Sequence, residues 1–328
     1  MTRILAALLC ATLTLALGTR PGRAQEGALL LHSVYPAHSL HTRAAQALAD
    51  EVRESTGGAV RIQVLPGGVP GLRGPDLLEA VRGGTPPLAN MLMGEVSRTE
   101  RAFAISTLPL LARSLADARR LHDRCRPLYE TLCARWGQTL LLAAPWPPSG
   151  LFSRWPVHTM ADLAGLRLRV YDTTMAGFFA RAGARPVDLP WVDLLSALHG
   201  GAVDAVLTSP TSAVDVALWE HLPHFLALDL AYPLNMLTIN TQALDALAPG
   251  HRAALLDAAA RAQERLWLEV EHEAAQSLAA IQRHGVVVVR PDPSLEPALD
   301  ALAQDMRREF LWRAGEDAAT AIEAYLRP

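Results

Sequence analysis

The sequence contains no lysine, because all 30 of its basic residues are arginines. It carries 33 acidic residues, so the formal net charge is only -3. A nearly neutral chain has no electrostatic grip on nucleic acid or on an anionic membrane surface, so we expect no nucleic-acid partner. Together with the alanine-rich segments, the excess of arginine indicates a GC-rich coding bias rather than a basic binding surface.

Catalytic and metal-binding motifs are also missing from the sequence. It contains no G-x-S-x-G nucleophile elbow, and the glycines around residue 70 do not form the G-x-G-x-x-G pattern of a dinucleotide site. Two H-x-x-H pairs, His38/His41 and His221/His224, lack the glutamate of the zinc-protease H-E-x-x-H pattern. We therefore predict no catalytic residue, no metal ligand and no cofactor, and expect that the protein is not an enzyme.

Cysteine is scarce, with three residues in the chain. Cys10 lies in an N-terminal apolar run, which leaves Cys125 and Cys133 to pair in an oxidising compartment. Eight residues along one continuous helix separate two positions by about 12 Å, too far for a disulfide. Pro127 lies between the two cysteines and could break that helix. The sequence leaves both a disulfide and two buried thiols open.

The first 24 residues have the three parts of a secretory signal peptide. Arg3 supplies a positive charge, residues 4–18 form an apolar run too short to span a bilayer comfortably, and Gly22-Arg23-Ala24 offers a small-x-small cleavage site. No later apolar run is long enough to cross a membrane. The pattern predicts a periplasmic protein, exported through a cleavable signal peptide at residues 1–24.

Beyond this leader, short apolar strands alternate with amphipathic helices in two series, a pattern typical of α/β sheets. Strands are expected at residues 28–32, 60–65 and 88–93 in the first series. The second series has strands at 140–143, 166–171 and 203–207. The proline-rich segment 145–148 is the expected crossover between two lobes. We assign residues 27–143 and about 252–284 to lobe 1, and 144–251 and about 285–328 to lobe 2.

One long helix is predicted over residues 249–284. Apolar residues recur there at a helical spacing, and neither proline nor glycine interrupts the segment between Gly250 and Gly285. About 33 helical residues would reach roughly 50 Å, which is longer than one lobe needs. A single helix that braces both lobes fits this length better than two helices with an unmarked bend.

Arg169 is the candidate anion-binding residue that the strand pattern offers. It lies at the end of the expected strand 166–171, and ligands of open α/β sheets bind beyond the carboxyl ends of strands. A guanidinium there presents a planar fork that matches a carboxylate. Alternation places Arg167 on the same face, and a surface salt bridge explains either arginine equally well, so position alone does not decide between these readings.

An ordered set of motifs along the chain distinguishes between these readings better than the position of Arg169 does. The segment 162–170 (DLAGLRLRV) is followed by 183–187 (GARPV), 191–193 (WVD) and 197–205 (ALHGGAVDA), and is preceded by 56–58 (TGG), 65–68 (LPGG) and 108–111 (LPLL). In this order the motifs resemble the DctP-type solute-binding proteins of tripartite ATP-independent periplasmic (TRAP) transporters. The resemblance covers roughly residues 28–290.

The resemblance implies a two-lobed periplasmic binding protein fold, type II-like, with a hinge and a long bracing helix. It implies that Arg169 holds a ligand carboxylate and that Trp191 packs against the ligand. Similarity to one branch of the family adds further candidates for the cleft: Trp146, Ser149, Thr208, Ser209, Asn235 and Glu95, with Tyr35 from the other lobe. The segment 94–108 is shorter than is usual in the family, which puts the contacts of Glu95 in question.

The expected function is therefore capture of a small organic acid anion by hinge closure and its delivery to the small and large membrane subunits of a TRAP permease. The two tryptophans favour a monocarboxylate with an aliphatic or aromatic body over a C4-dicarboxylate. Two alternatives stay open at this point. One is a periplasmic carboxylate sensor, and the other is a periplasmic hydrolase that uses the same crevice.

Overall fold

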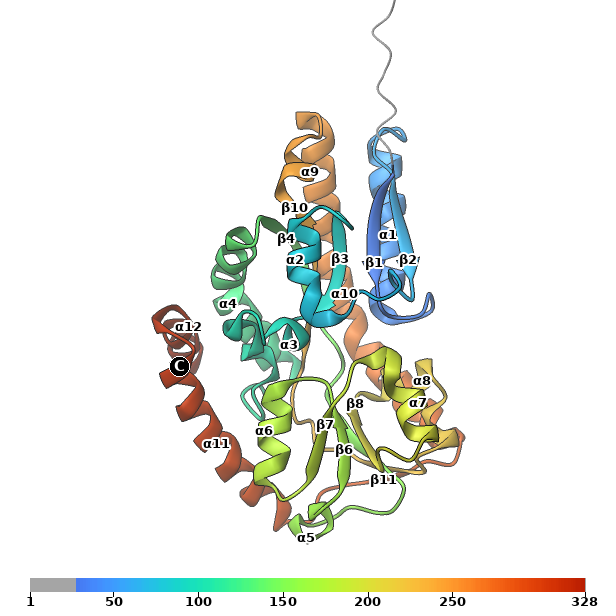
Figure 1. Cartoon of the computed structure of the whole chain (residues 1–328), viewed down its shortest axis with the longest axis vertical. Helices are drawn as coiled ribbons and strands as arrows, with labels where there is room; N and C mark the ends of the chain where they lie inside the picture. Colours follow the sequence, from blue (N-terminus) through green and yellow to red (C-terminus); the bar gives the residue numbers. More distant parts are fainter. Residues whose placement is uncertain (1–27, 328) are drawn as a thin grey trace, which may run out of the picture.

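Two β-sheets organise residues 28–327, the part of the chain that the computed structural model describes. Each sheet carries its own helices, and the two resulting lobes lie one above the other along the long axis (Figure 1). The structure therefore has the two-lobed α/β architecture expected from the sequence. The expected signal peptide at residues 1–24 lies outside the described residues.

Lobe 1 is built on a five-stranded sheet. Its strands, in spatial order, are β2 (Ile62–Pro66), β1 (Leu29–Ser33), β3 (Leu88–Leu92), β10 (Leu234–Asn240) and β4 (Gln138–Pro145). The pairs β1–β2 and β1–β3 are parallel, whereas β10 runs antiparallel to both of its neighbours. Every residue of β3 and β10 is buried, as expected for central strands covered on both faces.

Lobe 2 is built on a six-stranded sheet. Its order is β11 (Val287–Val289), β9 (His224–Leu226), β5 (Gly150–Ser153), β8 (Ala205–Thr208), β6 (Arg167–Val170) and β7 (Arg185–Asp188). Strands β6, β7 and β8 are parallel, so their carboxyl ends meet at one edge of the sheet. That edge faces lobe 1 and is where ligands of open α/β sheets bind.

Helices pack around both sheets. The α-helices of the described residues are α1 (Leu40–Ser55), α2 (Leu77–Arg82), α3 (Met93–Val96), α4 (Leu115–Arg135), α5 (Met160–Leu163), α6 (Thr173–Arg181), α7 (Leu194–His199), α8 (Pro210–Asp215), α9 (Thr241–Asp245), α10 (Pro249–Arg283), α11 (Leu295–Arg313) and α12 (Glu316–Leu326). None of them is long and apolar enough to cross a membrane.

The long helix is confirmed as one element. Helix α10 has 35 residues without a break and packs on α1 and β4 of lobe 1 and on α8 of lobe 2. Its buried face includes Leu255, Leu266, Val270 and Ile281, which follow the spacing seen in the sequence. In Figure 1 it runs from the upper lobe down into the lower one, so it ties the two lobes together.

The chain crosses between the lobes at two adjacent segments near the cleft. The first joins β4 to β5 through the proline-rich segment 145–148, where the sequence predicts a crossover. The second joins β9 to β10 and was not foreseen. Backbone hydrogen bonds connect the two segments, from Trp146 N to Pro233 O (2.9 Å) and from Ser149 N to Ala231 O (3.0 Å). These two hydrogen-bonded segments, between β4 and β5 and between β9 and β10, form the hinge region.

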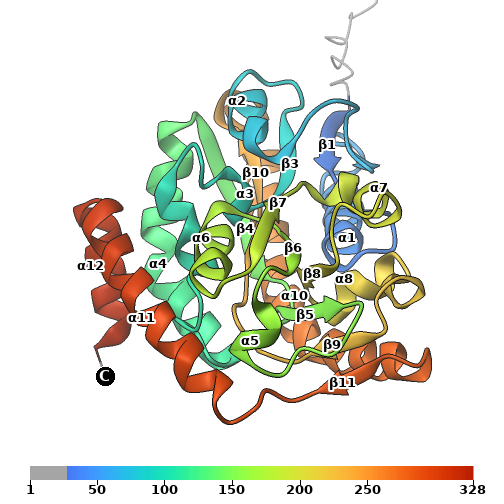
Figure 2. The same ribbon diagram turned by 60° about the horizontal axis from the view of Figure 1, so that its bottom comes forward.

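This second crossing corrects the expected lobe boundaries. Residues 234–240 form β10 in the sheet of lobe 1, although the sequence assigned 144–251 to lobe 2. The C-terminal segment is also shared, because α11 packs on α6 of lobe 2 whereas α12 packs on α4 of lobe 1 (Figures 1 and 2). An apolar strand does not reveal by its own sequence which sheet it joins, since the pairing is non-local.

The two cysteines of the described residues lie on one face of the uninterrupted helix α4. Cys125 and Cys133 are both buried and both free, although Pro127 lies between them. Burial raises the pKa of each thiol to about 12. Of the two alternatives left open by the sequence, the structure has two buried thiols, because the helix continues through the proline and keeps them apart.

Candidate functional site

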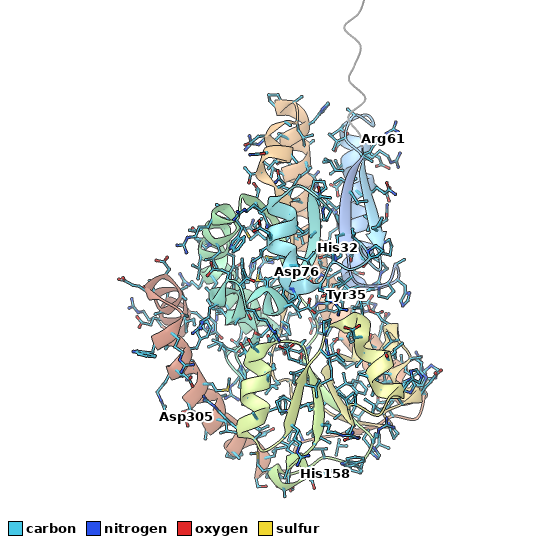
Figure 3. All side chains as sticks on the ribbon, viewed as in Figure 1. His32, Tyr35, Arg61, Asp76, His158 and Asp305 are labelled. Atoms are coloured by element: carbon cyan, nitrogen blue, oxygen red, sulfur yellow. The ribbon has the colours of Figure 1, made fainter. Side chains whose placement is uncertain are left out.

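A cavity lies between the two lobes, beside the hinge. It is lined by Tyr35, Leu92, Glu95, Trp146, Ser149, Arg169, Tyr171, Trp191, Thr208, Ser209, Ser212 and Pro233. Eight of the nine residues predicted from the sequence are among them. Figure 3 shows Tyr35 where the upper lobe meets the lower one, whereas His158 lies at the far end of the lower lobe. Residues remote from one another in sequence therefore converge at the junction of the lobes.

Arg169 occupies the end of β6, next to the last residue of the strand. Its side chain is only 2% exposed, whereas Arg167 on the same strand is exposed. Arg167 donates to Asp204 through Nε (2.6 Å) and Nη2 (2.6 Å), so it forms the surface salt bridge that the sequence left open. The structure thus separates the two arginines: Arg167 is paired on the outside, and Arg169 lies in the cavity wall.

The guanidinium of Arg169 is fixed but has no counter-ion within the described residues. Its Nε donates to the carbonyl of Leu189 (2.9 Å), and its centre lies 5.6 Å from the ring of Trp191. Neither terminal nitrogen has a hydrogen-bond partner or ion pair among residues 28–327. Burial lowers the pKa of Arg169, and the carboxylate of Glu95 opposes that effect in part. Burying a guanidinium without a paired charge costs free energy, and the terminal nitrogens of this one border the cavity.

Glu95 lies in helix α3 and faces the cavity from lobe 1. Burial raises the pKa of its carboxyl to about 7, although the positive charge of Arg169 pulls in the opposite direction. Asp188 and Asp172 add like-charge repulsion. At neutral pH the carboxyl of Glu95 is therefore close to half protonated, and any anion placed beside Arg169 would favour its protonated form.

The remaining polar lining residues lie at the ends of strands. Thr208 ends β8, and the hydroxyl of Ser209 caps helix α8 by accepting from the backbone of Ser212 (3.1 Å). Ser149, just before β5, shares a hydrogen bond of 3.3 Å with the hydroxyl of Tyr171. These hydroxyls line the same cavity as the guanidinium and are neutral groups that can both donate and accept.

Aromatic rings form the apolar walls. Tyr35 and Trp146 meet edge to face with ring centroids 4.9 Å apart, and Trp191, which belongs to lobe 2 like Arg169, has its ring beside the guanidinium. Behind Trp146 lies the buried ring of His41, 4.4 Å away. Burial lowers the pKa of His41 to about 3, so it packs as a neutral ring.

Asn235 is the predicted site residue that does not line the cavity. Its side chain is fully buried, accepts from the hydroxyl of Tyr35 (3.0 Å) and donates to Asn90. Asn235 therefore lies behind Tyr35 and not in the cavity wall, so its contact with a ligand stays a prediction without support from the lining. Four lining residues were not predicted: Leu92, Tyr171, Ser212 and Pro233. Alternation could have found Tyr171, since it is two residues beyond Arg169.

Two ion pairs close the cleft from outside. Arg73 of lobe 1 pairs with Asp193 of lobe 2, and Arg98 of lobe 1 pairs with Asp188 of lobe 2. All four side chains are partly exposed, so each pair is screened by salt and adds little to stability by itself. They nevertheless exist only when the lobes are together, so the structure describes a closed form.

The sequence matches one known protein family over most of its length. Residues 31–311 match DctP, the bacterial extracellular solute-binding proteins of family 7. The chain is a member of this family. Its fold is shared with TRAP extracytoplasmic solute receptors, which are binding proteins rather than enzymes. The family resemblance seen in the sequence is thereby confirmed.

Several solved DctP-type proteins are similar over nearly the whole chain. DctP7 of Bordetella pertussis, an extracytoplasmic solute receptor binding pyroglutamic acid, is 28% identical, with a TM-score of 0.88 over 91% of this chain and 99% of that one. A marine metagenome TRAP solute-binding protein specific for pyroglutamate is 25% identical, with a TM-score of 0.86 over 92% and 98%. The 2,3-diketo-L-gulonate-binding periplasmic protein YiaO of Escherichia coli is 26% identical over 82% of both chains.

Proposed function

We propose that this protein is an exported receptor that captures a small organic monocarboxylate and delivers it to a TRAP permease. One observation carries the proposal: the cavity between the lobes contains a buried guanidinium, that of Arg169, whose terminal nitrogens have no partner among residues 28–327. A carboxylate would satisfy both nitrogens at once in the bidentate geometry that guanidinium favours. The pyroglutamate bound by DctP7 and the marine protein is such an acid.

The size of the cavity favours a small acid. It offers about 40 Å³ to the centres of water molecules. One water needs roughly 10–15 Å³ by that measure and takes about 30 Å³ of liquid, so the guest has a volume on the order of 100 Å³. The rings of Tyr35, Trp146 and Trp191 would contact its body. A five-carbon ring acid fits this description better than a hexuronate or a peptide.

Capture works by hinge closure. With the lobes apart, Arg169 is reached by solvent and by the acid; with the lobes together, the ion pair is shielded from water and the outer ion pairs form. The acid drives closure because it binds the closed form more tightly than the open one. The hydroxyls around Arg169 satisfy the remaining lone pairs of the carboxylate, which a buried ion pair requires.

A thermal-shift panel of organic acids on the mature protein tests the binding step. An acid present at 100 times its dissociation constant stabilises the protein by about 2.7 kcal/mol, which raises its melting temperature by a few degrees. The panel contains pyroglutamate, monocarboxylates, C4-dicarboxylates and hexuronates, each with its neutral carboxamide as control. Stabilisation by acids and not by their carboxamides supports the proposal; stabilisation by no acid, or equally by the carboxamides, contradicts it.

Delivery and export form the second part of the proposal. Residues 1–24 would direct the chain to the periplasm and be removed there, and the closed form would dock on the small and large membrane subunits. Uptake of the acid into vesicles that carry the permease, dependent on this protein, supports transport. Acid binding without any such uptake would instead favour a sensor. Unchanged acid after prolonged incubation with the protein rules against the hydrolase alternative.

A further inference from the structure

A chain of buried amides runs from the backbone of lobe 1 to the cavity. It begins at the carbonyl oxygen of His41, passes through Asn90 and Asn235, and ends at the hydroxyl of Tyr35. Tyr35 is 6% exposed, and Asn90 and Asn235 are 1% and 0% exposed. Water therefore has no access to the amides, and their hydrogen bonds must be satisfied by one another.

The carbonyl at the start of the chain fixes the direction of every bond after it. A backbone carbonyl can only accept, so the amide nitrogen of Asn90 must face His41 O, at 3.2 Å. The amide oxygen of Asn90 then faces Asn235, which must present its own nitrogen there. The amide oxygen of Asn235 is thereby turned to Tyr35. Reversing either amide would bring two acceptors together in a buried site.

The hydroxyl of Tyr35 therefore donates its proton to Oδ1 of Asn235, with 3.0 Å between the two oxygens. What the phenol oxygen offers to the cavity is a lone pair and not a proton. The side chain of Trp146 is consistent with this direction, because an indole nitrogen can only donate a hydrogen bond. Burial raises the pKa of Tyr35, and the neighbouring indole of Trp146 opposes that rise, as expected of a donor beside the phenol oxygen. A hydroxyl oxygen has two lone pairs, so one is left for a ligand.

The two walls of the cavity are therefore opposite in polarity. Lobe 2 presents the donors of Arg169, whereas lobe 1 presents an acceptor from Tyr35. We infer that the fixed Tyr35 hydroxyl selects acids that carry an N–H or O–H donor on the side of the body that faces lobe 1 when the carboxylate is held by Arg169, and that it rejects acids of the same shape with an acceptor there. This inference rests on the proposed function, since it concerns the ligand of the same cavity.

The test compares two probes that differ by one group. Pyroglutamate has a ring N–H where its lactone counterpart, 5-oxotetrahydrofuran-2-carboxylate, has a ring oxygen. Calorimetric titration of wild-type protein should give a dissociation constant at least about tenfold lower for the lactam, because the lactone places an oxygen against an unpaired buried acceptor. In Tyr35→Phe the lactam should weaken more than the lactone, and the ratio should fall toward one.

Tyr129→Phe is the matched control, because it removes the same oxygen from a buried tyrosine of α4 that does not line the cavity. It should keep the wild-type ratio. Equal binding of the two probes by wild type, or an unchanged ratio in Tyr35→Phe, overturns the inference and leaves the proposed function standing. Arg169-dependent binding of an acid that has no donor, as tight as that of the lactam, also overturns it. If no acid binds at all, the proposed function fails and the inference fails with it.

Discussion

Replacing Arg169 with methionine should strongly weaken ligand binding and leave stability without ligand nearly unchanged. The methionine side chain has a similar length and keeps the contact with Trp191, but it removes a buried charge that has no counter-ion among the described residues. Removing one partner of a buried charge pair costs about 2–5 kcal/mol of binding free energy. Since about 1.4 kcal/mol corresponds to a tenfold change, affinity for the acid should fall by roughly 30-fold to several thousand-fold.

Stability without ligand should change little. The variant loses the hydrogen bond from Arg169 to Leu189 O, and bonds from charged groups contribute about 1.5–3 kcal/mol. It also loses the desolvation penalty of an unpaired guanidinium, which is several kcal/mol even after relaxation. In the ligand-free protein the lobes are apart and solvent reaches Arg169, so this penalty applies only in part and the two effects nearly cancel. The ligand-free variant should therefore unfold at close to the temperature of wild type.

Calorimetric titration with the acid and thermal unfolding without it measure the two effects. Arg167→Met is the matched control on the same strand, where the arginine is exposed and paired with Asp204. It should bind the acid normally and be slightly less stable than wild type. A ligand-free Arg169→Met protein that is clearly less stable than wild type, or one that binds the acid normally, would refute the reasoning.

Three further outcomes follow from the structure. Burial raises the pKa of the Glu95 carboxyl to about 7, and an acid bound beside Arg169 raises this pKa further. Binding therefore takes up a proton, and the affinity for the acid falls as the pH rises above 7. Titrations between pH 6 and 9 should show this fall in wild type and not in Glu95→Gln. Breaking the outer pair by Arg98→Gln should weaken binding by less than about fivefold, and 0.5 M salt should remove the difference; a larger loss, or one that salt does not change, would contradict this. Native protein should resist alkylation, and denatured mature protein should take up two labels at Cys125 and Cys133 without reductant; no label would reveal a disulfide.

Local patterns predicted the elements that depend on neighbouring residues. The periodicity of residues 249–284 gave the bracing helix almost residue for residue, because a helix buries a stripe of side chains at fixed spacing. The strand end at Arg169 was also visible, and the family resemblance favoured it over Arg167. The structure shows why the two arginines differ. Arg167 forms an ion pair with Asp204, whereas Arg169 lines the cavity.

The missed features depend on contacts between distant segments. Strand β10 joins the first sheet through pairing with β3 and β4, and nothing in residues 234–240 specifies these neighbours. The place of Asn235 behind Tyr35 follows from the same pairing. One signal was present: Asn90 interrupts the otherwise apolar run of β3, and a buried amide in a central strand needs polar partners. A buried amide of this kind therefore indicates a network of buried hydrogen bonds, even when the sequence does not show which other residues belong to it.

A crystal structure of the protein with the most stabilising acid of the panel tests the central claim most directly. We predict closed lobes, with both carboxylate oxygens within about 2.7–3.2 Å of the terminal nitrogens of Arg169. A guest without an acidic group in the cavity, or a side chain of Arg169 turned away from the bound acid, would contradict the account.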